Sequence, residues 1–402
     1  MNKKNKNNKF TSFVVPFCSF LAVCFLLFIF TFYVDGEMGI ILIYFTFSAP
    51  VLSVILTLNG RKKVDVTFEN DAYVKKGAST DVKISLSKKT LLPIGFVEIY
   101  TETAENLSQT VCAYRTSLSS KQKSEIIHTL TAMNGGYSYF KIKEVYVCDY
   151  LGFFRFKIKT PLPSASTIGV IPNIPQVSAS NQLFKSINNI VVTSDEETEQ
   201  DTVLAFSANT CPGYEHREYI EGDSLKRVNW KVSSKRHKLM VRLDEAVSSV
   251  QPAIVFDLYR GAESSSKDAI IREERLYESV FGLLLLFVNQ GIGCNFIYRT
   301  ADSTINQCSI ESEDALNTVL FSILTVPVSV ENPIDYSKID NSGACAVIAA
   351  VPYINNRYAD VLSSVMNSEL NCAVVSDSIN NVPVNSLEIW CMDEDNDFKL
   401  VK

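Results

Sequence analysis

The residues best suited to chemistry lie in one polar block, residues 211–245. Cys211 and His216 stand five positions apart and could supply a thiol nucleophile with an imidazole base. The chain has three histidines, so few groups could act as a base near neutral pH. Nothing in the sequence places a third residue to orient the imidazole. A hydrolase that uses this block is therefore the alternative function, and we expect no enzyme and no catalytic residue.

Arginines and carboxylates give the same block a second role. Arg217 and Arg227 each carry a planar guanidinium that can bind a carboxylate through two parallel hydrogen bonds. The candidate partners are Glu221, Asp223 and Glu245. Such a network would either fix the segment around Trp230 against the next domain or form a docking or anion-binding patch. Asp223 or Ser224 is also placed to cap a short helix that runs on to Trp230.

The block resembles the signature of the DUF58 family, bacterial proteins of unknown biochemical function. That signature is an Arg-x-Tyr-x-x-Gly-Asp-x-x-Arg string with a Trp, a basic position and a Leu-x-Val-x-x-x-Glu tail. The residues that stand at its polar and aromatic positions are Arg217, Tyr219, Gly222, Asp223, Arg227, Trp230, Lys235 and Glu245. Lys235 replaces the usual Arg. The resemblance marks these residues as the signature and interaction site.

Further landmarks extend the resemblance over most of the chain. Residues 136–137, 149–154 and 170–172 are similar to the family's upstream motifs, although Gly135 replaces an Arg. The resemblance implies a C-terminal domain of the von Willebrand factor A type. It also implies partners, since relatives are often encoded near MoxR-type AAA+ ATPases and transglutaminase-like membrane proteins.

Asp257 stands where the von Willebrand factor A fold often binds Mg²⁺ through Asp-x-Ser-x-Ser. Oxygen ligands of that kind suit a hard cation. Here both serines are absent, and Arg260 adds a positive charge. We therefore expect a degenerate site at Asp257 with no metal, and Asp257 either paired with Arg260 or solvated. No P-loop, GxGxxG or HExxH motif occurs, so we expect no cofactor.

An α/β domain is expected over residues 251–402, after a linker and signature segment over residues 173–250. Apolar runs predict strands at 253–257, 295–298, 344–351 and 372–376. Helical spacing predicts helices at 268–290, 314–324 and 356–368. Such alternation favours a doubly wound, mainly parallel sheet. The acidic stretch 193–202 is typical of a flexible linker.

A β-sandwich domain is expected over residues 64–172. Short runs of alternating polar and apolar residues recur there with turn residues between them. The apolar segment 149–154 either forms a recognition corner or is a turn followed by aromatic core residues. We expect the turn with core residues.

Two apolar runs precede that domain. Residues 13–34 and 38–59 lack charges, and each is long enough as a helix to cross a bilayer. Residues 35–37 leave room only for a tight turn, which predicts a transmembrane helical hairpin over residues 13–59. Lysines and an arginine flank both runs and the turn is acidic, so residues 1–12 and the soluble domains are expected in the cytoplasm.

Composition sets limits on other functions. The net charge is -6, and no basic stripe with aromatics appears, so nucleic-acid binding is not expected. The ten cysteines form no CxxC pair, which argues against a zinc site and fits a reducing compartment. The sequence therefore predicts a multi-pass cell-membrane protein that contacts lipid and works as a scaffold or interaction protein, with a MoxR-type ATPase as the expected partner.

Overall fold

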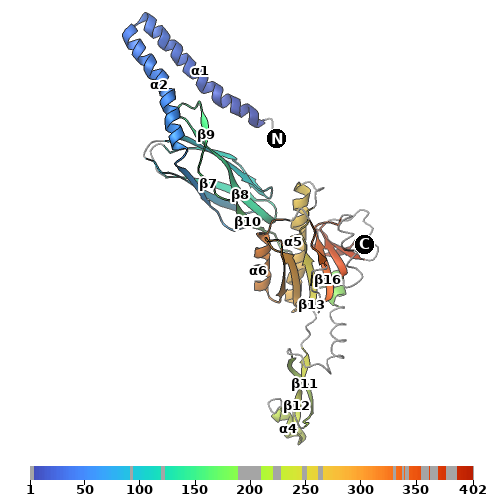
Figure 1. The fold of residues 1–402 in the computed structure, drawn as a ribbon. Helices are drawn as coiled ribbons and strands as arrows, with labels where there is room; N and C mark the ends of the chain where they lie inside the picture. The colour runs from blue at the N-terminus through green and yellow to red at the C-terminus, as the bar shows by residue number, and fades with distance from the viewer. Residues whose placement is uncertain are drawn as a thin grey trace. The chain divides into compact units, whose positions relative to one another are not determined.

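The chain is described here by a computed structural model. It describes residues 4–90, 94–118, 123–188, 210–220, 228–246, 251–260, 266–328, 332–336, 339, 344–354, 362, 370–376 and 387–401. Contacts divide the chain into two units. The first comprises residues 1–173, 265–274 and 324–327, and the second comprises the remainder. Figure 1 labels the elements of both units.

The first unit begins with a pair of helices, α1 (Lys4–Tyr33) and α2 (Gly36–Gly60). Asp35 caps α2 because its side chain accepts hydrogen bonds from the amides of Glu37 and Met38. Gly39 allows close approach of the helices, since a Cβ there would lie 2.7 Å from the Thr31 Cα. Among the described residues, α2 is long and apolar enough to cross a membrane, and Phe17–Tyr33 is a shorter apolar helical stretch.

Two facing sheets follow the helix pair and form what we term the two-sheet domain. One sheet is ordered β1-β3-β7-β5, and the other is ordered β2-β10-β8-β4-β6 with β9 beside β8. The strands of this domain are β1 (Val64–Glu69), β2 (Tyr73–Lys75), β3 (Ser79–Lys88), β4 (Ile94–Thr103), β5 (Leu107–Gln109), β6 (Ala113–Leu118), β7 (Lys123–Ala132), β8 (Gly136–Cys148), β9 (Arg155–Lys157) and β10 (Ser166–Ile171). Ile84 and Ile99, from different sheets, belong to one buried cluster. The prediction of a β-rich segment is confirmed.

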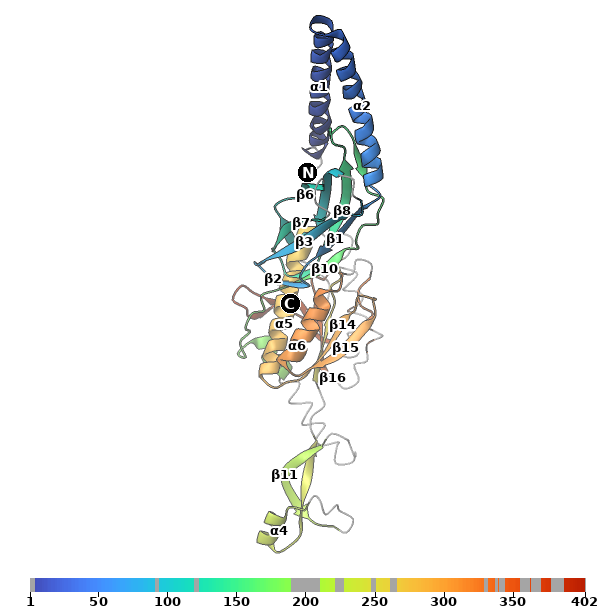
Figure 2. The same cartoon turned by 90° about the vertical axis from the view of Figure 1, so that its left-hand side faces the viewer.

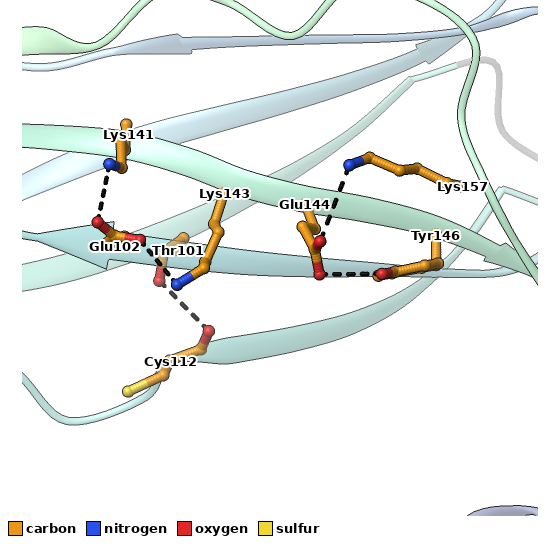
Figure 3. Close-up of polar contacts among 8 residues, drawn as sticks. All are labelled: Thr101, Glu102, Cys112, Lys141, Lys143, Glu144, Tyr146 and Lys157. Atoms are coloured by element: carbon orange, nitrogen blue, oxygen red, sulfur yellow. Dashed lines mark hydrogen bonds and ion pairs between the residues drawn. The ribbon is translucent and has the colours of Figure 1, made fainter. Parts of the chain in front are cut away.

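A bulge in β8 changes which residues face the core. Opposite β4, Tyr100 pairs with Glu144 and Thr101 pairs with Ile142, so Lys143 is the extra residue. Ile142 is buried before the bulge and Val145 is buried after it, so the alternation shifts phase. On the outer face, Lys141 and Lys143 both bind Glu102, as Figure 3 shows.

The second unit contains a seven-stranded sheet ordered β15-β14-β13-β16-β17-β18-β19. Its strands are β13 (Gln251–Phe256), β14 (Cys294–Arg299), β15 (Ile305–Ile310), β16 (Ala344–Val351), β17 (Leu370–Val375), β18 (Glu388–Met392) and β19 (Phe398–Leu400). The inner strands pair in parallel, and the edge strands β15 and β19 are antiparallel. The four predicted strands are confirmed, while β15, β18 and β19 were not predicted.

Both faces of this sheet are buried, as a mainly parallel sheet requires. Helices α5 (Ser266–Asn289) and α6 (Glu313–Leu324) accompany it, close to the predicted ranges. Tyr277 and Phe281 of α5 pack on Phe256 of β13. The alternate residue, Val255, belongs to a second buried cluster on the opposite face. The predicted helix 356–368 lies outside the described residues except for position 362.

Candidate functional site

The signature block forms a small element of its own within the second unit. Its strands are β11 (Thr210–Glu218) and β12 (Met240–Ala246), which pair antiparallel, and its helix is α4 (Trp230–Arg236). The predicted cap, Asp223 or Ser224, lies outside the described residues. The predicted helix does not run on to Trp230, because Val228 and Asn229 are not helical and α4 begins at Trp230. Asn229 is the reason: it is extended, and its side chain accepts the amide hydrogen of Val232 as an N-cap.

The side chain of Asn229 also forms a hydrogen bond with the His216 ring. The Asn229 Nδ2 lies 2.8 Å from the His216 Nε2, so the imidazole nitrogen accepts and the amide donates. Ser233 then donates to the Asn229 carbonyl at 2.8 Å and accepts the Met240 amide hydrogen at 2.8 Å. His216 therefore holds α4 against the strands. Cys211 pairs through its backbone with Glu245 on β12, and the side chains of these two residues lie outside the described part.

The remaining predicted residues are divided between described and undescribed positions. Gly222, Asp223 and Arg227 lie outside the described residues. The Arg217 guanidinium donates to the Glu218 carbonyl at 3.2 Å. The backbone amide of Tyr219 donates to the Leu239 carbonyl at 2.8 Å and so extends the strand pairing. The predicted pairing of Arg217 with a carboxylate stays a prediction.

Apolar and cationic side chains share the surface of the signature block. Trp230 has 64% of its surface exposed, and Ile220 and Leu239 are also exposed. Exposed basic residues surround them on α4 and just after it, namely Lys231, Lys235, Arg236 and Lys238. Lys238 forms an ion pair with Glu218 at 2.6 Å. Trp and Arg are enriched at protein interfaces, so Trp230 and Arg236 are suited to the centre of a contact. The lysines add positive charge, which favours an acidic partner.

Asp257 is buried at the end of β13, with 1% of its surface exposed. Its Oδ2 accepts the Ile334 amide hydrogen at 2.7 Å, and its Oδ1 lies 3.8 Å from the Arg299 Nη2. The expectation that Asp257 stays solvated is therefore wrong, and its pairing with Arg260 stays a prediction. Burial, together with the charge of Asp257, raises the pKa of Tyr336 well above its usual value. Asp257 thus anchors the segment that carries Ile334.

Metal binding at Asp257 is not supported by any neighbouring ligand set. Within the described ranges, no group of three or more His, Cys, Asp or Glu side chains is placed to hold an ion. A cation would also have to displace the Arg299 guanidinium from its place near the carboxylate. The absence of a metal stays a prediction.

A second buried aspartate, Asp149, joins helix α2 to the two-sheet domain. The Ser53 hydroxyl donates to Asp149 Oδ2 at 3.2 Å and accepts the Tyr150 amide hydrogen at 2.9 Å. Asp149 Oδ1 accepts the Phe154 amide hydrogen at 2.7 Å. The expected turn is present, but Phe154 is exposed rather than in the core, so that part of the expectation is wrong. Sequence reasoning missed Ser53, a polar residue inside an apolar run.

Comparison with known proteins adds little. No protein-family model matches the chain, and no match is found among curated proteins. A cohesin module from a Clostridium perfringens family 33 glycoside hydrolase is 10% identical over 27% of this chain and 97% of its own, with a TM-score of 0.21. Escherichia coli alpha-2-macroglobulin is 13% identical over 29% of this chain and 18% of its own, with a TM-score of 0.24. Similarities this low carry no argument about function.

Proposed function

We propose that this chain is a membrane-anchored scaffold or interaction protein of the DUF58 type. Helices α1 and α2 would form a two-helix transmembrane hairpin carrying a β-sandwich and then an α/β domain of the von Willebrand factor A type. The observation that carries this proposal is the direct join between α2 and the two-sheet domain. Ser53 lies inside the apolar helix and is hydrogen-bonded to the buried Asp149, so the anchor and the domain are held together.

Charge at the helix ends supports a cytoplasmic location for the domains. Arg61, Lys62 and Lys63 follow α2, whereas Asp35 and Glu37 lie at the turn between the helices. Basic residues flanking a span stay preferentially on the cytoplasmic side. The cell membrane is therefore the proposed location, with two crossings and the soluble domains inside.

The signature block is the proposed docking surface for a MoxR-type AAA+ ATPase. Trp230 supplies an exposed aromatic anchor, and Lys235 with its basic neighbours supplies positive charge. We favour interaction over the hydrolase alternative because His216 is bound to Asn229, the N-cap residue of α4, and so has a structural role in this element. By the family resemblance alone, the proposal extends to Arg217, Tyr219, Gly222, Asp223, Arg227 and Glu245.

Labelling with a membrane-impermeant maleimide in intact cells tests the topology. Cys112 is a free, exposed cysteine of the two-sheet domain. With the other cysteines replaced by serine, it should react only after lysis, and Cys112→Ser should remove that signal. In the Cys112→Ser background, Glu37→Cys should react in intact cells, because it lies in the turn. Reversed labelling would place the domains outside and exclude an intracellular ATPase as partner.

Binding of the full chain in nanodiscs to a purified MoxR-type ATPase tests the partner. Trp230→Ala should weaken binding by about tenfold or more, as expected for an aromatic anchor. Ile127→Ala is the matched control, since Ile127 is equally exposed on β7. An equal effect of both substitutions, or no binding by the unmodified chain, would contradict the proposed docking surface.

A further inference from the structure

The loop between β8 and β9, residues 149–154, presents apolar side chains outside the core of its own domain. Tyr150, Leu151 and Phe154 are exposed, and Phe153 is half-buried. Gly152 adopts a φ of 76°, which a glycine permits at the tip of the loop. Figures 1 and 2 show this green loop reaching alongside the helix pair.

Contacts with the helices place this loop beside their apolar stretches. The Phe153 ring makes edge contacts with Phe20 and Phe17, at centroid distances of 5.3 and 6.5 Å. A mainly apolar cavity of about 550 Å³ opens between the helices and the loop. Its lining residues are Ser19, Phe20, Val23, Phe45, Thr46, Ala49, Leu151 and Phe153. The Thr46 hydroxyl donates to the Leu42 carbonyl of its own helix, so it does not call for a polar occupant.

The depth of the loop follows from the rise of a helix. Ala49 precedes the end of the charge-free run at Asn59 by about ten residues, which is roughly 15 Å along α2. Half of a hydrocarbon core about 30 Å thick is the same distance. If α2 spans a bilayer, the side chains of Leu151 and Phe153 that line the cavity with Ala49 lie below the headgroups of one leaflet.

Cations mark the level of the headgroups around the base of the loop. The Lys159 amide donates to the Arg61 carbonyl at 3.1 Å, which brings the end of α2 beside the segment that follows β9. The Arg61 guanidinium lies 5.7 Å from the Phe156 ring centroid. Exposed basic side chains nearby are Lys62, Lys63, Arg155, Lys157 and Lys159, of which Lys157 is also near Glu144. Anionic headgroups attract such a cluster.

Much of the loop backbone is hydrogen-bonded within the protein. Unpaired amides cannot enter hydrocarbon without a large cost. Four amides of the loop are paired: Asp149 donates to the Phe154 carbonyl, Gly152 to the Asp149 carbonyl, Phe154 to the Asp149 carboxylate, and Tyr150 to the Ser53 hydroxyl. The buried Asp149 therefore lets an irregular loop lie at membrane depth.

We propose that residues 150–154 insert into the membrane leaflet next to the domain, as a third membrane contact beside α1 and α2. The loop buries its apolar side chains among lipid acyl chains, and an acyl chain fills the cavity between Phe20, Ala49 and Phe153. The basic cluster meets anionic headgroups. This inference rests on the proposed membrane anchor, and it adds that the two-sheet domain is itself a lipid-contacting module with a fixed tilt at the surface.

Tryptophan quenching by brominated phospholipid tests the insertion. The full chain is reconstituted in liposomes of anionic and neutral lipid, with or without bromine on the acyl chains. Every variant carries Trp230→Phe, so that the buried Trp390 is a shared background. Phe153→Trp and Phe154→Trp report on the loop, Phe47→Trp reports on α2, and Ile127→Trp reports on the exposed surface of β7.

The expected result is a loss of emission and a shift to shorter wavelength for the two loop reporters and for position 47, with neither change at position 127. Quenching at position 47 without quenching at 153 and 154 would overturn the loop insertion and leave the anchor intact. No quenching at any position would overturn the proposed anchor itself. Quenching at 127 as strong as at 154 would show adsorption of the whole domain surface and would also overturn the insertion.

Discussion

The two units each contain a buried aspartate beyond a strand end, and the partners of the two carboxylates differ. Asp149 follows β8 and accepts hydrogen bonds from the Ser53 hydroxyl and the Phe154 amide. Asp257 follows β13, accepts the Ile334 amide hydrogen and lies near the Arg299 guanidinium. One carboxylate joins a loop to the apolar helix α2 through neutral donors, and the other joins the end of β13 to the loop that carries Ile334, with a guanidinium nearby.

This difference teaches how to interpret a buried carboxylate. Burying a charge without compensation costs several kcal/mol, so its partners show what it stabilises. Asp257 stands where the resemblance drawn from the sequence implied a degenerate metal site, and a guanidinium lies near its carboxylate. Asp149 accepts hydrogen bonds from neutral donors in a tight loop, and its role is to organise a surface. Neither geometry resembles a general acid or base exposed to a substrate.

The largest effect is expected from Asp257→Ala. It leaves the Ile334 amide and the Arg299 guanidinium without this partner, which should cost about 3 kcal/mol of unfolding free energy. Urea unfolding of the full chain in detergent, in a Trp230→Phe background, would follow the fluorescence of Trp390. That residue is buried on β18 of the same sheet, so it reports on the second unit.

Two variants control this measurement. Asp257→Asn keeps an acceptor for the Ile334 amide and should lose less than the alanine variant. Asp302→Ala removes an exposed carboxylate of the same unit and should change stability by no more than about 0.5 kcal/mol. Equal midpoints for Asp257→Ala and Asp302→Ala would show that Asp257 does not anchor the sheet.

Asp149→Ala should have the next largest effect, about 2 kcal/mol, confined to the first unit. It leaves the Phe154 amide unpaired and removes one partner of Ser53, at the expected cost of each lost bond in a buried site. Hydrogen exchange of the amides of residues 150–156 should become faster, while β16 stays protected. Asp81→Ala, which removes an exposed acceptor of the Thr129 hydroxyl, is the control. Unchanged exchange at Phe154 would refute the role of Asp149.

Much of the α/β sheet could be predicted because its core residues repeat along the sequence. Leu276, Val280 and Leu284 share one helical face, and the helix predicted from them forms. The edge strand β15 could not be predicted, because its burial pattern lacks regular alternation. The signature block was expected to contain a helix ending at Trp230. Its strands contain several charged residues, so the pairing of β11 with β12 left no regular apolar signal.

The site was less predictable because its contacts join residues far apart in sequence. Ser53 and Asp149 are separated by 96 positions, and Asp257 and Ile334 by 77. Sequence spacing suggested Arg260 as the partner of Asp257, and the neighbouring parallel strand brings Arg299 near the same carboxylate. A serine inside an apolar run was the available signal for Ser53. Its partner could be found only once the fold placed the β8–β9 loop against α2.

His128 is a buried titratable group of the first unit whose neutral form is favoured, and it can be compared with the two buried aspartates. Its Nδ1 lies 2.6 Å from the Tyr114 hydroxyl, and burial lowers its pKa. The unfolded chain binds a proton as pH falls through about 6.5, whereas the folded chain does so only at lower pH. Stability present above pH 6.5 is therefore lost as the pH falls below that value.

For a single proton the loss is at most about 1.4 kcal/mol per pH unit below the pKa of the unfolded chain. Hydrogen exchange of the β7 amides above pH 6.5 and at pH 5.5, corrected for intrinsic exchange rates, would measure this loss of stability. His128→Gln should remove this part of the pH dependence, and the Trp390 unfolding midpoint should respond equally to pH in both proteins. An unchanged pH dependence in His128→Gln would show that other groups cause the acid sensitivity.

The smallest effect is expected from Lys143→Ala, which tests an exposed carboxylate against the two buried ones. Hydrogen bonds from Lys141 and Lys143 lower the pKa of Glu102. The pairing therefore stabilises the folded chain above the usual carboxyl pKa, and this stability is lost as the pH falls through the lowered pKa. Both lysines are well exposed, so water and salt screen the pair and the loss should be below about 0.5 kcal/mol. Thermal unfolding followed by circular dichroism should show a shift that vanishes at high salt, and Lys141→Ala should behave alike. A larger shift in Lys143→Ala alone that persists at high salt would contradict this, because a screened ion pair cannot cause such a shift. It would mean that Lys143, the extra residue of the β8 bulge, determines the strand register.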